Sequence, residues 1–291
     1  MSTPTHTLSL PLAHLKVVSL ALNLPGPAAL MRLKALGADC LKIDPPSGDP
    51  MQTYSPQAHA TLHNGIATQV LNLKAPADLD TLHQHLQTAD VLLTSFRPSA
   101  LRKLGLPWEC LHEQHPRLIL VEIVGAPGPL AEIPGHDLTY MAEQGLVTGL
   151  TLPPTLFADM GGALLACEAV LAALVTRHRT GTGSHHQVAL SDAAAWLGLP
   201  QTWHLTTAQG DVGGAHAGYR VYPCQDGRVA VAALEPHFAR SLCQVASLAP
   251  ETDMRAPETA HALALFFANH SRAQLSTLAE AHDLPLCALP S

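Results

Sequence analysis

The 291-residue sequence contains few charged residues and no basic cluster. Charged side chains make up 13% of the chain, about half of the ~25% that is usual in soluble domains. The net charge is −7, and no run of lysines and arginines occurs. This excludes the usual electrostatic surface of a nucleic-acid-binding protein. The apolar fraction of 47% is ordinary, so the low charge does not indicate disorder.

The sequence also lacks three local signals. None of the six cysteines forms a CxxC pair, which excludes the common zinc and redox motifs. No positive charge precedes the first apolar residues, as a secretory signal requires. The longest apolar stretch, Gly161–Thr176, contains Glu168 and is shorter than the ~20 residues of a membrane span. We therefore expect a cytoplasmic protein with reduced thiols and no membrane partner.

Short β-rich runs alternate with helical segments over the first two thirds of the chain. The expected strands are Lys16–Leu22, Cys40–Ile43, Val70–Leu73, Val91–Thr94, Leu118–Val124 and His186–Leu190. Apolar strands that alternate with helices predict a parallel sheet covered on both faces. Such a pattern predicts an α/β fold with a Rossmann-like large domain over residues 1–208.

The pattern changes after residue 208. Two alternating segments, Gly218–Pro223 and Arg228–Leu234, flank Asp226-Gly227, which is a strong β-hairpin signal. Helical segments follow to the end of the sequence. We predict a smaller α+β domain over residues 213–291.

Two helices are expected to carry an ionisable residue in their first turn. One follows Gly135-His136-Asp137, and the other opens with Asp159-Met160-Gly161-Gly162. An aspartate at a helix start commonly caps it by accepting unpaired N–H groups. Spacing alone favours that role for both aspartates. Histidine is abundant, with 18 residues, so a histidine beside an aspartate is weak evidence by itself.

Neither a metal site nor a tightly bound cofactor is predicted. Three pairs of nearby histidines have no cysteine or carboxylate at a matching ligand spacing; they are His83/His85, His112/His115 and His185/His186. The single Gly181-Thr182-Gly183 does not make a dinucleotide-binding fingerprint.

Five blocks resemble, in the same order, the family III CoA-transferases (the CaiB/BaiF family), which include α-methylacyl-CoA racemases. The first block is LPGPAALMRLKALGADCLKIDPPSGDP, and the blocks cover residues 24–50, 89–106, 115–129, 177–194 and 219–236. The resemblance implies a Rossmann-like large domain, an acyl-CoA substrate that brings its own coenzyme A, and a homodimer of interlocked chains.

Within that family, both helix starts of this chain are similar to the racemase motifs. The transferases instead resemble one another in a Tyr-Asp or similar pair at the position of His136-Asp137. The resemblance implies epimerisation of 2-methylacyl-CoA thioesters, with His136 and Asp159 as two bases that flank the α-carbon. It also implies that Glu235 is a hydrogen-bond partner of His136. Free N–H groups at the helix start would bind the thioester oxyanion, with Gly161 and Gly162 allowing its close approach.

The chain departs from the family pattern in two places. Residues 62–68 carry none of the cations of the family's basic loop, and the usual C-terminal segment that returns to the large domain is absent after residues 282–291. The remaining candidate contacts to CoA are Lys42, Lys74, Arg97, Arg102 and Lys103.

Two alternative functions stay open. One is a CoA-transferase in which Asp159 forms an acyl anhydride, and the other is a catalytically degenerate homologue with a binding role.

Overall fold

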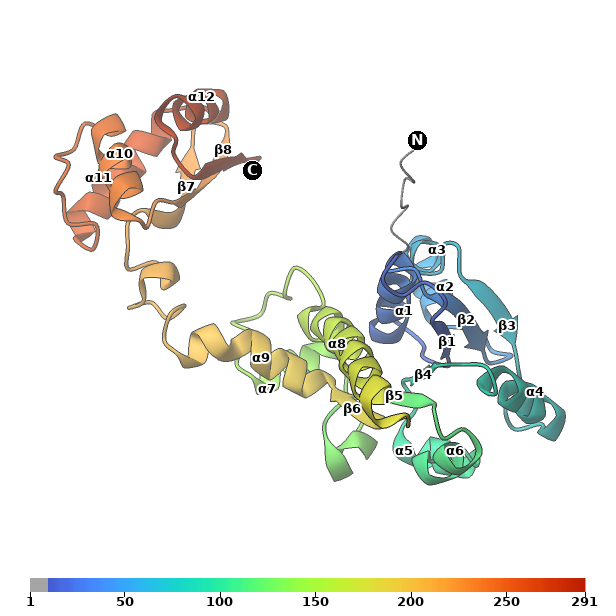
Figure 1. Ribbon diagram of the computed structural model, residues 1–291. Coiled ribbons are helices and arrows are strands. Elements are labelled where there is room, and N and C mark those ends of the chain that lie inside the picture. The colour runs from blue at the N-terminus through green and yellow to red at the C-terminus, as the bar shows by residue number, and fades with distance from the viewer. Residues whose placement is uncertain (1–9, 291) are drawn as a thin grey trace, which may run out of the picture. The chain divides into compact units, whose positions relative to one another are not determined.

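The computed structural model describes residues 10–290 and shows two compact units (Figure 1). The first unit extends to Gly198 and the second begins at Leu199. This division falls inside helix α9 (Leu190–Thr202), ahead of the residues 208–213 expected from composition. The helical segment after Ser191 therefore carries the chain out of the first unit.

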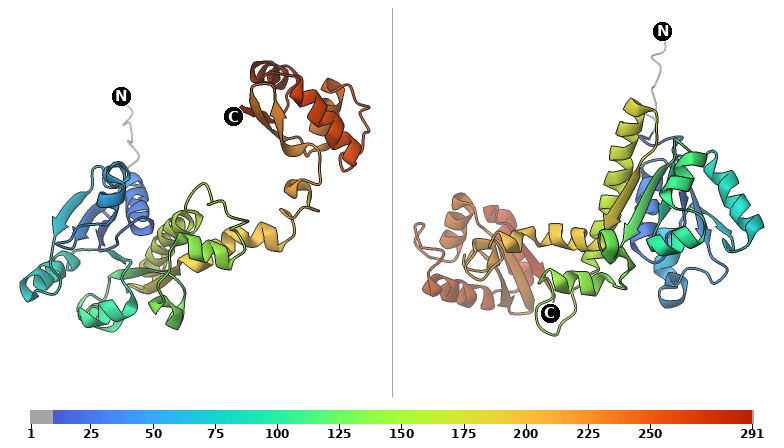
Figure 2. Two further views of the ribbon diagram at one scale, coloured as in Figure 1. Left: turned by 180° about the vertical axis from the view of Figure 1, so that it is seen from behind. Right: turned by 90° about the horizontal axis from the view of Figure 1, so that it is seen from below.

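The first unit is built on a six-stranded sheet in which all neighbouring strands are parallel (Figure 2). The strand order is β3-β2-β1-β4-β5-β6. The strands are β1 (Lys16–Ser19), β2 (Asp39–Asp44), β3 (Ala67–Val70), β4 (Val91–Thr94), β5 (Ile119–Val124) and β6 (His185–Ala189). This sheet confirms the predicted α/β class.

Helices cover both faces of the sheet. Successive side chains of a strand point to opposite faces, so each buried strand contributes to two cores. The helices of this unit are α1 (Pro25–Ala35), α2 (Met51–Tyr54), α3 (Pro56–Leu62), α4 (Pro76–Leu86), α5 (Pro98–Lys103), α6 (Trp108–Gln114), α7 (Asp137–Glu143) and α8 (Phe157–Thr180). Val17 and Leu93 belong to a core shared with α1 and α8, whereas Val18 and Leu92 belong to a core shared with α4, α5 and α6.

One strand differs from its expected position. The third strand was expected at Val70–Leu73, but β3 covers Ala67–Val70 and pairs with β2. This strand lies at the edge of the sheet, and most of its side chains are exposed. An edge strand can be polar, so the search for an apolar run placed it too late.

The second unit contains an antiparallel sheet in the order β7-β8-β9. Its strands are β7 (Tyr219–Cys224), β8 (Gly227–Ala232) and β9 (Leu286–Leu289), and its helices are α10 (Pro236–Val245), α11 (Pro257–Ala268) and α12 (Arg272–His282). The β7–β8 hairpin turns at the predicted Asp226, which confirms a small α+β unit. Strand β9 was not predicted.

Helix α8 is, among the described residues, the one helix long and apolar enough to cross a membrane by length and composition alone. One of its faces is buried in the core through Ala166, Cys167 and Val170. Its other side exposes large apolar side chains, among them Leu164 and Val175. Within the first unit, as far as the structure describes it, this side of α8 therefore presents apolar side chains at the surface.

Candidate active site

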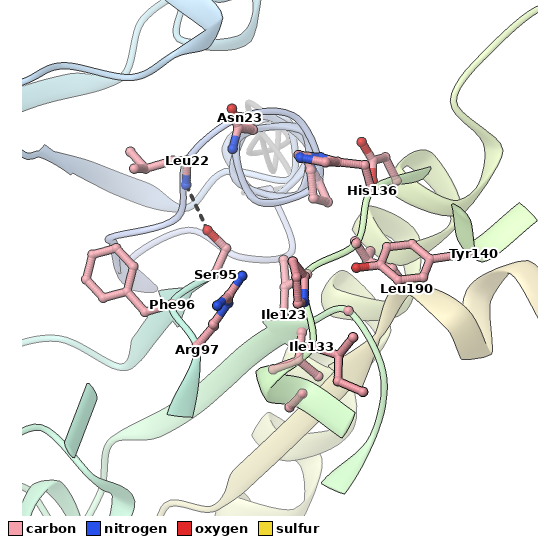
Figure 3. A pocket seen from close by; sticks show the side chains of 17 residues that line it. Leu22, Asn23, Ser95, Phe96, Arg97, Ile123, Ile133, His136, Tyr140 and Leu190 are labelled. Atoms are coloured by element: carbon pink, nitrogen blue, oxygen red, sulfur yellow. Dashed lines mark hydrogen bonds between the residues drawn. The ribbon is translucent and has the colours of Figure 1, made fainter. Parts of the chain in front are cut away.

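The candidate site lies where the strand order of the large sheet reverses. Strands β1 and β4 are neighbours, and the chain leaves them toward opposite sides of the sheet, which opens a crevice at their carboxyl ends. Leu20–Asn23 follow β1, and Ser95–Arg97 follow β4. The N–H of Leu22 donates to Oγ of Ser95 across 3.0 Å (Figure 3). This bond joins the two diverging loops at the floor of the site.

A pocket of about 160 Å³ occupies this crevice. Its lining combines one histidine, one aspartate and one arginine with further polar and apolar residues. Figure 3 shows His136 and Tyr140 on one side of it, and Asn23, Ser95 and Arg97 on the other. Asp159 also lines the pocket. The structure thus brings together three of the predicted site residues, His136, Asp159 and Arg97.

Asp159 lies in the first turn of α8 and has an unusual electrostatic environment. Burial, and then the negative charge of Asp137, raise its carboxyl pKa from 3.8 to about 7. Both effects disfavour the charged form. A carboxyl group with this pKa can accept or donate a proton near neutral pH, as general acid–base catalysis requires.

The buried Asp137 holds these elements together. Its Oδ1 accepts a hydrogen bond of 3.0 Å from the backbone N–H of Asp159, so Asp137, from α7, caps the first turn of α8. Spacing alone had suggested that each aspartate caps its own helix. The structure instead gives Asp137 a contact between helices, and sequence reasoning missed this role. The capped N–H is also unavailable to a substrate oxyanion.

His136 immediately precedes α7 and is exposed. Its backbone N–H donates to Oγ1 of Thr139 across 3.1 Å, which fixes the main chain at the start of the helix. The residue that follows His136 is Asp137, and its buried side chain holds the main chain in place there. Together these contacts place the imidazole at the pocket without burying it in the core.

The glycines near the site allow two helices to pack closely. A Cβ on Gly162 would lie 2.3 Å from Cδ2 of the buried Leu190, and a Cβ on Gly161 would lie 3.2 Å from Cδ1 of Leu197. Both therefore allow α9 to pack closely on α8. The expectation that the pair also lets a thioester carbonyl come close stays a prediction.

Lys42 has no surface open to a phosphate, contrary to the role expected for it. Its side chain is fully buried, and its ammonium contacts the carboxylates of Asp44 and Asp49. A buried lysine without such partners would be strongly destabilising. In this structure Lys42 neutralises buried carboxylates instead of facing CoA.

The other predicted cations are exposed but separated. Arg97 lines the pocket of His136. Lys74 lines a neighbouring pocket of about 140 Å³, and Phe96 is common to both pockets. Arg102 contacts Glu132 at 3.4 Å on the surface, and Lys103 lies beside it in α5. Arg97 and Lys74 are thus the two candidates that line cavities at this edge of the sheet.

Glu235 lies in the second unit, where it is exposed and precedes α10. Its expected hydrogen bond to His136 stays a prediction.

The chain is similar to proteins that act on CoA thioesters. It is 32% identical over 287 residues to the acetyl-CoA:oxalate CoA-transferase of Acetobacter aceti, covering 90% of this chain and 71% of that one. It is 31% identical over 242 residues to the human alpha-methylacyl-CoA racemase, covering 77% and 62%. The chain therefore spans only part of each relative.

The fold is shared with a solved structure of the Mycobacterium tuberculosis protein Rv3272. That structure matches with a TM-score of 0.83 and 27% identity, covering 97% of this chain and 84% of the other. The model of the family named CoA-transferase family III matches residues 12–290. On this match, which covers nearly the whole described chain, the protein belongs to CoA-transferase family III.

Proposed function

We propose that this chain epimerises 2-methylacyl-CoA thioesters by transferring the α-proton between two bases. The observation that supports this most is the presence of His136 and Asp159 in one pocket. Acyl transfer through a carboxylate needs a single nucleophile, whereas inversion at carbon needs a proton acceptor and a proton donor. The similarity to alpha-methylacyl-CoA racemase agrees with this reading.

The proposed reaction uses the two side chains in opposite protonation states. One side chain removes the α-proton. The electron pair of the broken C–H bond then forms the thioester enolate. The other returns a proton to the opposite face and restores a neutral thioester. The raised pKa of Asp159, about 7, suits both roles, because either protonation state is populated near neutral pH.

Coenzyme A is proposed to enter as part of the substrate. Arg97 at the catalytic pocket and Lys74 at the neighbouring one supply positive charge at the carboxyl edge of the sheet. The reacting acyl group would then occupy the pocket of His136, with the phosphates toward the cations. No tightly bound cofactor is needed for this chemistry.

The reaction can be tested with a single enantiomer of a 2-methylacyl-CoA and a free carboxylate acceptor such as acetate. We expect the opposite enantiomer to accumulate while no acetyl-CoA forms. Formation of acetyl-CoA without inversion would contradict the proposal.

The alternative is a CoA-transferase, which the similarity to acetyl-CoA:oxalate CoA-transferase favours. In that reaction the carboxylate of Asp159 attacks the thioester carbonyl, the C–S bond breaks and CoA leaves as its thiolate. The resulting anhydride would react with hydroxylamine to give a hydroxamate at residue 159, which mass spectrometry detects. We expect no such adduct in the wild-type protein, with Asp159→Asn as the blank. A degenerate homologue would show neither reaction.

A homodimer is also proposed. The exposed apolar side chains of α8 and α9 include Leu164, Val175 and Trp196, and large exposed apolar patches commonly mark interfaces. Sedimentation equilibrium should give twice the chain mass of 30.7 kDa, and a monomer would contradict the proposal. The cytoplasmic location and the absence of a nucleic-acid or membrane partner stay predictions.

A further inference from the structure

Three potential metal ligands converge beside the large sheet, outside the pocket of His136. Among the described residues, Asp49, His59 and His63 form the group of three whose donor atoms, one from each residue, lie within 4.8 Å of one another. His59 lies in α3, and His63 ends that helix four residues later. A spacing of four places both imidazoles on one face of the helix. Helix α3 packs beside α1 in the first unit (Figure 1).

Both histidines have a buried nitrogen that lacks a partner. Nε2 of His59 and Nε2 of His63 are shielded from solvent and make no hydrogen bond. A buried polar atom without a partner is unfavourable, so two such atoms in one place indicate a missing ligand. A surface histidine pair would not show this.

The tautomer of His63 is the one that a metal requires. Its Nδ1 lies 2.8 Å from the carbonyl oxygen of His59. Because a carbonyl oxygen only accepts, Nδ1 must carry a proton, and in the neutral ring Nε2 then keeps its lone pair. Metal-bound histidines typically donate their other ring N–H to a carbonyl or carboxylate in this way.

Asp49 still has capacity for a third ligand bond. Its Oδ1 accepts from the N–H groups of Asn23 and Met51, each at 3.0 Å, and its Oδ2 lies 3.3 Å from Nζ of Lys42. A carboxylate offers roughly four acceptor positions, so one position on Oδ2 is unused. Lys42 is itself neutralised by Asp44 as well as Asp49, and the cluster therefore has no excess positive charge.

We propose that Asp49, His59 and His63 bind a divalent transition-metal ion of the zinc class. Two imidazoles and one carboxylate match the ligands that Zn²⁺ prefers, with a fourth position left for water. Ligand atoms on one tetrahedral Zn²⁺ lie roughly 3.4 Å apart at the usual bond lengths. The donor atoms, which lie within 4.8 Å of one another, would therefore close by up to about 1.4 Å through side-chain rotation.

The site would also be linked to the catalytic pocket. Asn23, whose N–H is bound by Asp49, lines that pocket and adopts a left-handed conformation with φ of 65°. Oη of Tyr54 in α2 donates to its side-chain oxygen at 3.1 Å. A metal on Asp49 would hold this turn without touching the reacting atoms.

The test is metal binding by the full chain after treatment with a chelator. Calorimetry with Zn²⁺ should show one site per chain, and Co²⁺ should give the visible absorption of a four-coordinate ion. His59→Gln and His63→Gln should each weaken Zn²⁺ binding by at least about 10-fold, since loss of an outer partner alone costs roughly 10–100-fold. Zn²⁺ should raise the melting temperature of the wild-type protein and not that of His63→Gln.

The matched control is His83→Gln. His83 pairs with His115 at 3.3 Å between ring nitrogens and is a second place where a metal could bind. Zn²⁺ affinity unchanged in this variant supports the proposed site, and a loss here would overturn it. An unchanged affinity in His59→Gln and His63→Gln would overturn it as well, as would the absence of any stoichiometric Zn²⁺ or Co²⁺ binding. None of these outcomes depends on the epimerase activity.

Discussion

The carboxylate of Asp137 accepts a hydrogen bond from the backbone N–H of Asp159 across 3.0 Å. This contact has two effects. It caps the first turn of α8, and it keeps a negative charge close to the carboxyl group of Asp159, which contributes to the raised pKa of that residue. The residue beside the proposed base His136 thus tunes the proposed acid–base partner.

Asp137→Asn should separate these two effects. The amide oxygen can still accept from the N–H of Asp159, but the negative charge is removed, so the pKa of Asp159 should fall. For the enantiomer whose proton Asp159 removes, the acidic limb of the rate profile should move to lower pH. Asp137→Ala serves as the control, since it should also destabilise the fold by about 0.5–2 kcal/mol through loss of the cap. An acidic limb that stays in place in Asp137→Asn would contradict this link.

Asp159→Asn should make stability less dependent on pH. The pKa of Asp159 is about 7 in the folded protein and 3.8 as its reference value. Between these values the folded chain holds a proton that the unfolded chain releases, so wild-type stability falls as pH rises through this window. The asparagine variant lacks that loss. It should be more stable than the wild type at pH 8, by roughly 1–2 kcal/mol after solvent screening. The difference should shrink toward pH 4.

Urea unfolding at pH 4 and pH 8 checks this prediction. Asp192→Asn is a control, because Asp192 is exposed in the first turn of α9. A variant that is no more stable than the wild type at pH 8 would contradict the prediction, because the folded protein would then ionise Asp159 at no cost in stability.

His136→Ala should abolish inversion and leave the fold intact. The imidazole is exposed, so its loss creates no cavity, and the melting temperature should stay close to that of the wild type. Removing a general base typically costs about 10²–10⁴ in rate. His85→Ala, which changes a histidine bonded to Gln69 outside the pocket, should keep wild-type activity. Full activity in His136→Ala would exclude the two-base reaction.

Gly162→Ala should destabilise the first unit. The added methyl group would lie 2.3 Å from Cδ2 of Leu190, and overpacking of this kind costs about 1–3 kcal/mol. Gly161→Ala is the matched control in the same helical turn, because its closest contact is 3.2 Å, to the end of the Leu197 side chain. Alanine also favours a helix over glycine. Thermal unfolding should therefore rank Gly161→Ala well above Gly162→Ala, and equal stabilities would contradict the packing role.

The fold was predictable where the pattern depends on local sequence. The buried strands β4 and β5 were placed within a residue or so, because an interior parallel strand is apolar throughout. The edge strand β3 was placed too late, since half of its signal is polar. The role of Asp137 could not be read from spacing, because its hydrogen bond joins residues 22 positions apart.

The sequence motifs predicted the residues of the candidate pocket better than they predicted the contacts of single charged residues. His136, Asp159 and Arg97 meet in one pocket, whereas Lys42 was expected to contact CoA and is buried between two carboxylates. Asp44 follows Lys42 two residues later on the same face of β2. Asp49 reaches Lys42 from a later loop, and the strand pattern carries no signal of that contact. The same loop brings Asp49 to His59 and His63. The spacing of four relates the two histidines to each other, but no spacing rule relates them to Asp49.

Solvent exchange at the α-carbon tests the central claim most directly. One enantiomer of a 2-methylacyl-CoA is incubated with the protein in D₂O, deuterium at the α-position is followed by NMR, and the configuration of the released acid is determined. Two bases on opposite faces predict that deuterium uptake and the opposite enantiomer appear together. In His136→Ala, slow exchange with retention should persist for the enantiomer that Asp159 deprotonates. The absence of any α-exchange in the wild-type protein, once binding of the CoA ester has been shown, would contradict the account.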